Sequence, residues 1–477
     1  MATSVLESAF CPRSIAVIGA SNNPDKLGYK IVQAVGEGGF KGRLHPVNVG
    51  GGNIFGMKMY RNVSEIPGQI DLALIAIPAN LVPEAVKECG KKKVRSALVF
   101  SAGFGEIQGG AGLEQELTDT AKKYNVRIIG PNTNGIMNLN DNLNATFTPG
   151  LNYRTGNVAF VCQSGGYSSL LLRYGSGEGV GFSKIINLGN SCDIGFADSL
   201  EFLMKDDCTQ AIILYMEGFK HENEGRRFLE TAKEVTKTKP IVVVKVGRTE
   251  AGRRAAYSHT GSLAGSDELY NAAFRQAGLI RASDGVEMID IAKTLSLEHR
   301  LPRGNRTAII TNLGGPAVVA ADFCESRHIK IGELSEETKE RLRKMLSFTA
   351  SYANPVDLAA DWPKLHLYAD VLNAVLKDKQ VDIALVIVYI PPQSKHQTLI
   401  EDIVAASKKN EKPIVVCCLS TDSAVVADCI GRLDDYSIAS FRMPENAAKA
   451  IAALIMSSRY MKKVRTSQPS IRRKMIN

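Results

Sequence analysis

Short apolar runs recur along the chain, and each is followed by small residues. They include SIAVIGA (14–20), LALIAIP (72–78), SALVFSAG (96–103) and VRIIGP (126–131). Continuous apolar runs of this length are typical of strands that are buried on both faces. Stretches with a helical pattern separate them, so the sequence predicts an α/β fold with doubly wound parallel sheets. In such sheets a ligand binds beyond the carboxyl ends of the strands.

An internal repeat occupies much of the remaining chain. The segment GNVAFVCQSGGYSSLLLRYG (156–175) resembles GNRTAIITNLGGPAVVAADF (304–323), and TKPIVVVKVGRT (238–249) resembles EKPIVVCCLST (411–421). Each copy has the pattern of a strand, a glycine turn, a helix and further strands, which predicts two copies of one doubly wound unit. We expect an N-terminal domain over 1–145, repeated domains over 146–303 and 304–460, and a basic, disordered tail over 461–477.

Composition narrows the classes of function. The chain has 477 residues, which suits about three domains, and a net charge of +9 with a basic C-terminal segment. No aromatic residues are interleaved with that segment, so we expect a solvated tail, with a nucleic-acid partner as the disfavoured alternative. Nine cysteines without a CxxC pair indicate reduced thiols rather than disulfides or a zinc site. Without a long apolar run or signal-peptide features, we expect a cytoplasmic protein with no membrane segment.

Glycine-containing turns supply two candidate phosphate sites. GASNNPDKLG (19–28) follows the first strand, and QSGG (163–166) follows the first strand of the repeat. A strand that leads through such a turn into a helix presents free N–H groups and the positive helix end to an anion. The first turn matches neither GxGxxG nor a P-loop, so a structural turn and a nucleotide-type site both stay open. The second repeat has NLGG (312–315) followed by Pro316, which removes a donor, so we favour the first repeat.

A single histidine stands in YSHTGSLAG (257–265), a segment rich in serine and glycine. The second repeat has no histidine after its KPIVV strand, and it has Ile390 where the first repeat has Glu217. Because neighbouring parallel strands end at one edge of a sheet, we expect Glu217 to lie near His259 and fix its tautomer. A structural histidine and a solvated carboxylate are the alternatives. Metal ligation is disfavoured because no second ligand has suitable spacing.

Several motifs together resemble one known family. SIAVIGAS, SAGFGE (101–106), GPNTNG (130–135), QSGG, YMEG, SHTGSLAG and NPVDL (354–358) occur in that order between about residues 7 and 460. They resemble the α subunits of NDP-forming acyl-CoA synthetases, which include the ADP-forming acetyl-CoA synthetases of the succinyl-CoA synthetase superfamily. The resemblance implies a Rossmann-like CoA-binding domain followed by two flavodoxin-like domains. It also implies the reaction acyl-CoA + ADP + phosphate ⇌ carboxylate + ATP + CoA.

The resemblance also implies roles for particular residues. His259 would accept a phosphoryl group from an acyl phosphate and carry it to a nucleotide, while Glu217 orients the imidazole ring. The phosphoryl oxygens would bind at a cradle formed by Gln163, Ser164, Gly165 and Gly166. CoA would bind at Gly19, Ala20, Ser21, Lys26, Gly28, Pro78 and Asn132, with Asn132 near its thiol end.

The chain departs from the family pattern in two respects. The family often has VNPK after the second strand, whereas this chain has VNVGGGNIFG (47–56), with Val49 and Gly50 in place of the proline and lysine. Lys26 or Lys58 would have to compensate. The chain also has no segment for an ATP-grasp domain, so it should need an ATP-grasp β subunit that holds ADP or ATP with Mg²⁺, in an α2β2 assembly.

Other classes of function remain as alternatives. A dinucleotide-dependent oxidoreductase would use the first domain, but the GxGxxG pattern is missing and the histidine segment would have no role. A non-catalytic CoA-binding regulator would have lost His259 and Glu217, and both are present. The sequence leaves the acyl group, the nucleotide base and the physiological direction open.

Overall fold

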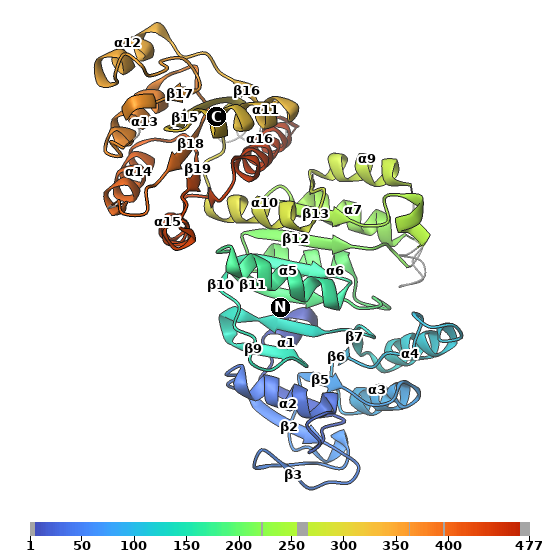
Figure 1. The fold of residues 1–477 in the computed structure, drawn as a ribbon. Helices are drawn as coiled ribbons and strands as arrows, with labels where there is room; N and C mark the ends of the chain where they lie inside the picture. The colour runs from blue at the N-terminus through green and yellow to red at the C-terminus, as the bar shows by residue number, and fades with distance from the viewer. Residues whose placement is uncertain (1–4, 221–222, 255–265, 362, 395, 468–477) are drawn as a thin grey trace, which may run out of the picture. The chain divides into compact units, whose positions relative to one another are not determined.

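The computed structural model describes residues 5–220, 223–254, 266–361, 363–394 and 396–467. The chain divides into two compact units, Met1–Gly285 and Val286–Asn477. Figure 1 shows the elements of both units.

The first unit contains a five-stranded parallel sheet in the order β2-β1-β5-β6-β7. Its strands are β1 (Ser14–Ile18), β2 (Arg43–Val47), β5 (Leu72–Ile75), β6 (Ser96–Val99) and β7 (Arg127–Ile129). The helices α2 (Leu27–Glu37), α3 (Val82–Lys91) and α4 (Ala111–Tyr124) connect them, and a short hairpin pairs β3 (Asn53–Ile54) with β4 (Met57–Lys58). Strand β1 lies between β2 and β5, which places a topological switch point beside the first glycine turn.

A second, seven-stranded sheet belongs to the same unit, in the order β14-β13-β12-β10-β11-β8-β9. Its parallel strands are β10 (Thr155–Cys162), β11 (Phe182–Asn187), β12 (Ala211–Met216), β13 (Ile241–Lys245) and β14 (Ile280–Arg281). Helices α5 (Gly165–Gly177), α6 (Phe196–Lys205), α7 (Glu224–Val235) and α9 (Asp267–Ala277) accompany them. The antiparallel hairpin of β8 (Gly135–Asn138) and β9 (Leu143–Thr146) extends the β11 edge. Residues 135–145, which the sequence assigned to the first domain, therefore hydrogen-bond into the second sheet.

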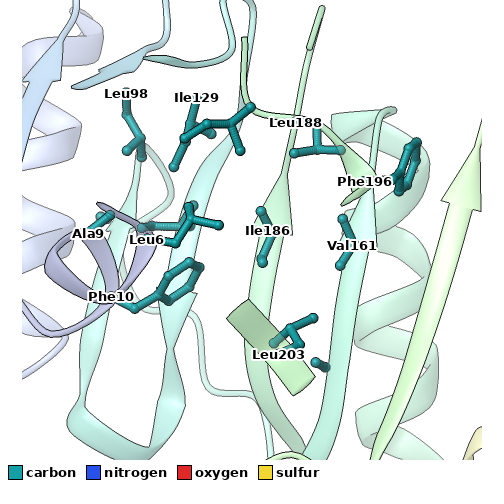
Figure 2. Close-up of a cluster of buried hydrophobic side chains, with 14 of the residues drawn as sticks. Leu6, Ala9, Phe10, Leu98, Ile129, Val161, Ile186, Leu188, Phe196 and Leu203 are labelled. Carbon is teal, nitrogen blue, oxygen red and sulfur yellow. The ribbon is translucent and has the colours of Figure 1, made fainter. Parts of the chain in front are cut away.

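The two sheets of the first unit share one hydrophobic core (Figure 2). Helix α1 (Val5–Phe10) contributes Phe10, which is fully buried and stacks on Phe202 with 4.9 Å between ring centres. The same cluster includes Ile129 of β7 and Ile186 of β11. The first two expected domains thus fold as one compact unit, because neither sheet buries its inner side chains by itself.

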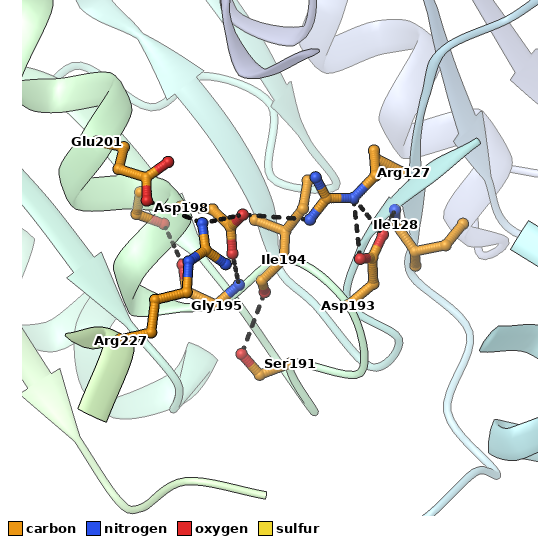
Figure 3. A network of polar contacts seen from close by, with 10 residues as sticks. Arg127, Ile128, Ser191, Asp193, Ile194, Gly195, Asp198, Glu201 and Arg227 are labelled. Atoms are coloured by element: carbon orange, nitrogen blue, oxygen red, sulfur yellow. Dashed lines mark hydrogen bonds and ion pairs between the residues drawn. The ribbon is translucent and has the colours of Figure 1, made fainter. Parts of the chain in front are cut away.

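A polar network also joins the two sheets (Figure 3). Arg127 at the start of β7 donates to Asp193 at 2.9 Å and pairs with Asp198 at 3.2 Å. Arg227 of α7 pairs with the same Asp198 at 3.0 Å and with Glu201 at 2.9 Å. These contacts hold the loop after β11 against the first sheet.

The second unit contains a sheet in the order β16-β15-β18-β19-β20, with β17 also paired to β15. The strands are β15 (Arg306–Thr311), β16 (Lys330–Ile331), β17 (Val356–Asp357), β18 (Ile383–Tyr389), β19 (Ile414–Leu419) and β20 (Ser440–Phe441). The helices are α10 (Gly285–Leu297), α11 (Gly314–Ser326), α12 (Glu336–Met345), α13 (Leu367–Lys377), α14 (Gln397–Lys409), α15 (Ser423–Asp435) and α16 (Pro444–Ser467). The order of β16, β15, β18, β19 and β20 matches that of β11, β10, β12, β13 and β14, which confirms two repeated doubly wound folds.

Two expected boundaries differ from the structure in this region. Nearly all of α10 falls in the second unit, so that unit begins at Val286 and not near 303. The reason is a buried ion pair between Lys293 of α10 and Asp434, at 2.7 Å, with a further bond from Lys293 to the Ser440 carbonyl at 2.8 Å. At the C-terminus, α16 continues to Ser467, well into the segment expected to be a disordered tail.

Replacing Phe10 with alanine should destabilise the first unit by about 3–5 kcal/mol, because it leaves a cavity in the core that both sheets share. Phe348→Ala is the matched control, since Phe348 is 93% exposed and its loss should change the unfolding free energy by less than about 0.5 kcal/mol. Urea unfolding followed by circular dichroism measures both. Equal effects of the two substitutions would contradict the shared core.

Candidate functional site

The turn after β1 brings the backbone of α2 against the backbone of the first strand. A Cβ on Gly28, at the start of α2, would lie 1.9 Å from the carbonyl oxygen of Gly19. Gly19 has a φ of +97°, and a Cβ there would lie 2.3 Å from the carbonyl oxygen of Ala76, in the loop after β5. Only glycine fits at either position, so the start of α2 lies directly on the end of β1. This is the geometry of an anion site at a helix N-terminus.

Part of the backbone of this turn is already hydrogen-bonded within the protein. The N–H groups of Gly19 and Ala20 both donate to the Val47 carbonyl, at 3.0 and 3.1 Å, so they are not available to a phosphate. Ser21 accepts from the N–H of Asn23 at 3.1 Å. In the first turn of α2, Tyr29 donates to the Lys26 carbonyl at 3.1 Å, so the candidate donors of this helix end are the N–H groups of Leu27 and Gly28. Sequence reasoning assigned the whole turn because it could not see that β2 accepts from its first two residues.

The other expected CoA residues lie at the same edge of the first sheet. Pro78 caps the short 3₁₀ helix η2 (Ala79–Leu81), which follows β5. Asn132 lies in the loop after β7 with a φ of +56°, and it is exposed. Lys26 is the exposed residue before α2, and Lys58 is exposed in the β3–β4 hairpin with its ammonium 5.6 Å from the Tyr60 ring centre. Compensation by either lysine stays a prediction.

The second turn begins helix α5 at the carboxyl end of β10. Ser164 is the residue before the helix, and its side chain makes no capping hydrogen bond. A Cβ on Gly165 would lie 2.4 Å from the side-chain amide of Asn134, whereas a Cβ on Gly166 would meet nothing within 4 Å. Gly165 therefore allows Asn134 to approach the helix end, and Gly166 leaves the helix N-terminus open to a ligand. The N–H groups of this first turn point along the helix axis toward that space.

The side chain of Gln163 is directed away from this cradle. Its amide oxygen accepts from the N–H groups of Glu217 and Gly218, at 2.7 and 3.2 Å. Its amide nitrogen donates to the Gly218 carbonyl at 3.0 Å. The Gln163 side chain thus fixes the end of β12 beside the start of α5, and a role of Gln163 in binding a phosphoryl group stays a prediction. Sequence reasoning saw only the glycine turn that follows this glutamine.

In the second repeat an amide side chain makes the same kind of hydrogen bonds to the backbone of the neighbouring strand end. These bonds show which residue replaces Glu217. Asn312 accepts from the N–H of Tyr389 at 2.8 Å and donates to its carbonyl at 3.0 Å. The strand registers agree, because Cys162 pairs with Tyr215 in one repeat and Thr311 with Ile387 in the other. Tyr389, and not Ile390, is thus the counterpart of Glu217. The two strands begin in register at Ala211 and Ile383, so Ile390 lies one position beyond the counterpart of Glu217.

Glu217 lies in a largely buried environment that contains another ionisable group. Its side chain is 4% exposed, and burial together with the Glu217 carboxylate raises the pKa of the neighbouring Tyr215.

Lys245 ends β13 beside β12 and is 2% exposed, with its ammonium 2.6 Å from the Val246 carbonyl and 4.6 Å from the Tyr270 ring centre. Burial, and secondarily Arg281, lowers the pKa of Lys245 to about 8, although Asp267 and Glu217 act in the opposite direction.

His259 lies outside the described residues, so its position relative to Glu217 stays a prediction. The segment that carries it connects the region after β13 with α9. Ser266 is the N-cap of α9, and its hydroxyl accepts from the Leu269 N–H at 3.2 Å. Its first residue, Asp267, pairs with Arg281 of β14. The described end that follows the histidine segment is therefore attached to β14 of the second sheet.

Sequence reasoning missed Lys245, Asn134 and the residues that position the Glu217 loop. The signal for Lys245 was present, because a lysine at the end of the apolar run IVVVK must either be buried or turn out of a strand. Asn134 stands inside the quoted GPNTNG motif, but only the fold brings it to α5. In the part of the chain that the structure describes, no helix is long and apolar enough to cross a membrane.

The family models match both parts of the first unit. Residues 13–138 match a CoA binding domain, and residues 155–295 match the succinyl-CoA ligase like flavodoxin domain. A solved structure of a dinucleotide forming acetyl-coenzyme A synthetase from Candidatus Korarchaeum cryptofilum, in complex with phosphate and ADP, is 36% identical with a TM-score of 0.89 and covers 98% of this chain and 99% of its own. The fold and these matches define the class as an acid–thiol ligase.

Full-length relatives identify the family more closely. The α subunit of acetate–CoA ligase (ADP-forming) II from Pyrococcus furiosus is 42% identical over 464 residues, covering 95% of this chain and 98% of the relative. The α subunit of the form I enzyme from the same organism is 40% identical and covers 96% of this chain and 99% of the relative. The chain belongs to the α-subunit family of ADP-forming acyl-CoA synthetases, the acetate–CoA ligases. This result supports the synthetase over the CoA-binding regulator.

Gly28→Ala should weaken CoA binding by about tenfold or more, because the added methyl group forces α2 away from the end of β1. Gly36→Ala, in the same helix, is the control, since a Cβ there meets nothing within 4 Å. Isothermal titration of each variant with CoA measures the effect. Equal affinity of the two variants would show that the α2 N-terminus does not hold CoA.

Lys245 should give the folded chain a distinct pH dependence. The pKa of Lys245 is about 8 in the folded chain and has its ordinary value of 10.5 in the unfolded chain. Between pH 8 and 10.5 the lysine is therefore mostly neutral in the folded state and mostly protonated in the unfolded state. The stability of the wild type relative to Lys245→Met should therefore rise as the pH increases from about 8 toward 10 and stay level below about 7. Melting temperatures of both proteins across this range test it. A constant or falling difference would contradict a buried, readily deprotonated lysine.

Proposed function

We propose that this chain is the α subunit of a cytoplasmic ADP-forming acetate–CoA ligase that catalyses acyl-CoA + ADP + phosphate ⇌ carboxylate + ATP + CoA. The observation that carries the proposal is the Gln163 clamp, which fixes the loop of Glu217 beside the open N-terminus of α5. A carboxylate and a cluster of free N–H groups are thereby held at one edge of a sheet. The first can orient an imidazole, and the second can bind phosphoryl oxygens.

The chemistry proceeds in balanced transfers. An oxygen of phosphate attacks the thioester carbonyl, the C–S bond breaks, and CoA leaves as a thiolate that takes up a proton, giving an acyl phosphate. A ring nitrogen of His259 then attacks phosphorus, forming a P–N bond as the P–O bond to the carboxylate breaks. Finally an oxygen of the ADP β-phosphate attacks phosphorus, the P–N bond breaks, and ATP forms. The histidine divides one transfer between separate sites into two shorter ones.

The residues of this chain have defined parts in these steps. The first-turn N–H groups of α5 at Gly165 and Gly166 hold the phosphoryl oxygens, and Glu217 accepts from the ring N–H of His259, so that the other nitrogen is free to attack. Asn134, whose amide lies against Gly165, is placed to donate to the acyl phosphate. These hydrogen bonds act in a partly buried site, where they are stronger than in water.

The residues present fit CoA in part. When bound, CoA supplies the thiol whose sulfur forms the thioester with the acyl group and departs when the C–S bond breaks. The start of α2, with Lys26 before it, offers donors and positive charge to the CoA phosphates, while Pro78 and Asn132 border the path toward the second sheet. Val49 is 89% exposed and Gly50 carries no charge, so the β2–β4 region contributes less than the family pattern would. We therefore expect CoA to depend chiefly on α2.

The partner subunit completes the reaction. The relatives above are named α subunits, which implies a second subunit, and we propose that it is an ATP-grasp β subunit that binds ADP or ATP with Mg²⁺ in an α2β2 assembly. Acetate is the first acid to test, because the relatives are named for it.

The proposal predicts a phosphohistidine at His259. Incubation of the chain with γ-labelled ATP and Mg²⁺, together with the β subunit, should give a label that is stable to base and labile to acid. His259→Ala should abolish the label, and the chain without its partner should take up none. Asn271→Ala, in α9 beyond the histidine segment, is a control that should label normally.

No label on a folded, partner-bound wild-type chain would refute the relay. A label that persists in His259→Ala would place the phosphoryl group on another residue.

A further inference from the structure

The SAGFGE motif lies at the centre of a polar cluster that joins the two sheets of the first unit. Glu106, the last residue of the motif, accepts from the N–H groups of Gly103 at 2.5 Å and Phe104 at 3.2 Å. Its other oxygen accepts from the side-chain amide of Asn190 at 2.5 Å. Burial opposes ionisation, but these hydrogen bonds from Gly103 and Asn190 hold the pKa of Glu106 below its ordinary value. The motif therefore presents a half-buried carboxylate to the loop after β11.

A second carboxylate completes the cluster. The amide nitrogen of Asn190 also lies 2.8 Å from Glu114 of α4, so one amide donates to two carboxylates. Glu114 in turn pairs with the ammonium of Lys220 at 2.9 Å, with both side chains only 13–14% exposed. Among the described contacts of this cluster, Lys220 supplies the positive charge that faces the two carboxylates. Removing it would leave two close carboxylates with only neutral donors, the Asn190 amide and the backbone N–H groups of residues 103–105, which is unfavourable in a partly buried site.

The cluster connects the two ends of the proposed reaction path. On one side, the amide nitrogen of Asn132 lies 3.4 Å from the side-chain oxygen of Asn190, whose N–H donates to the Pro131 carbonyl at 2.9 Å. On the other side, Lys220 is three positions after Glu217, in the loop that Gln163 holds at its beginning. The Glu217 loop is thus fixed at one end by β10 and at the other by α4 of the first sheet.

We propose that Asn190, Glu106, Glu114 and Lys220 are positioning residues that couple the CoA-thiol loop at Asn132 to the loop that carries Glu217. The inference rests on the proposed function, since it assumes that Asn132 borders CoA and that Glu217 serves the histidine.

Among these linked contacts, the one nearest the expected CoA site is the weakest. The Asn132–Asn190 contact is long for a hydrogen bond, and Asn132 is exposed, so a bound thioester can replace it at little cost. Asn190 is 3% exposed and bonded to both carboxylates, so a shift of its side chain alters the contacts of Glu114 and hence of Lys220. A largely desolvated ion pair such as Glu114–Lys220 adds little net stability but holds its two side chains in one geometry, which suits a positioning role. CoA binding then adjusts the Glu217 loop for the acyl transfer step.

The test separates the two half-reactions of the holoenzyme. Lys220→Met should leave labelling of His259 by ATP within about twofold of wild type, but slow the loss of label on addition of acetate and CoA by about tenfold or more. Lys220→Arg should restore the discharge rate. Lys184→Met is the matched control, because Lys184 pairs with Asp206 at 3.3 Å with similar burial in the same unit, and it should change neither step.

Three results would overturn the inference: discharge at the wild-type rate in Lys220→Met, equal slowing of labelling and discharge, or an arginine variant no better than the methionine variant. Failure of the proposed function would look different, since wild type itself would then take up no label.

A second measurement does not depend on phosphorylation. Addition of CoA to the wild-type complex should reduce hydrogen exchange in the peptide that contains Glu217 and Lys220, and Asn190→Ala should lose that reduction while still binding CoA. Unchanged protection in Asn190→Ala would overturn the coupling, whatever the outcome of the labelling.

Discussion

The hydrogen bonds from the Gln163 side chain to the backbone of Glu217 and Gly218 are the constraint on which the site depends. They join the carboxyl ends of two adjacent parallel strands, one of which leads into α5 and the other into the loop of Glu217. A buried backbone segment at a strand end must have its N–H and C=O groups satisfied. Gln163 satisfies three of these groups with one side chain, and in doing so it sets the distance between a helix N-terminus and a carboxylate.

The second repeat has the same kind of side-chain-to-backbone clamp but lacks the carboxylate. Asn312 bonds both backbone groups of Tyr389, yet a tyrosine stands where the first repeat has a glutamate. Pro316 also stands in the first turn of α11, where it has no N–H to offer. The clamp is therefore a property of the repeated fold, whereas the anion cradle and the carboxylate belong to the first copy. Under the proposed function, one fold supports a reactive site in one copy and a structural element in the other.

The sequence predicted the architecture well and the details of the site less well. Apolar runs and the repeat were sufficient for the α/β fold, because strands buried on both faces are conspicuous in a sequence. The boundary near 145 was less accurate, because β8 and β9 follow the first sheet in the chain but pair with β11. The predicted roles of Gly19, Ala20 and Gly28 at CoA stay predictions; the structure adds that the N–H groups of Gly19 and Ala20 donate to Val47, a partner that only the strand order reveals. Gln163 and the Asn190 cluster act through contacts between distant segments, which no local pattern contains.

The central claim is that Glu217 and the α5 N-terminus serve a phosphoryl group carried by His259. Phosphorus NMR of the complex, made with ¹⁵N-labelled histidine and treated with ATP and Mg²⁺, tests it most directly. The account predicts one new phosphorus signal that is split by a directly bonded ring nitrogen, and a changed signal when Glu217 is replaced by glutamine. A phosphoryl signal without nitrogen coupling, or one that is insensitive to Glu217, would contradict it.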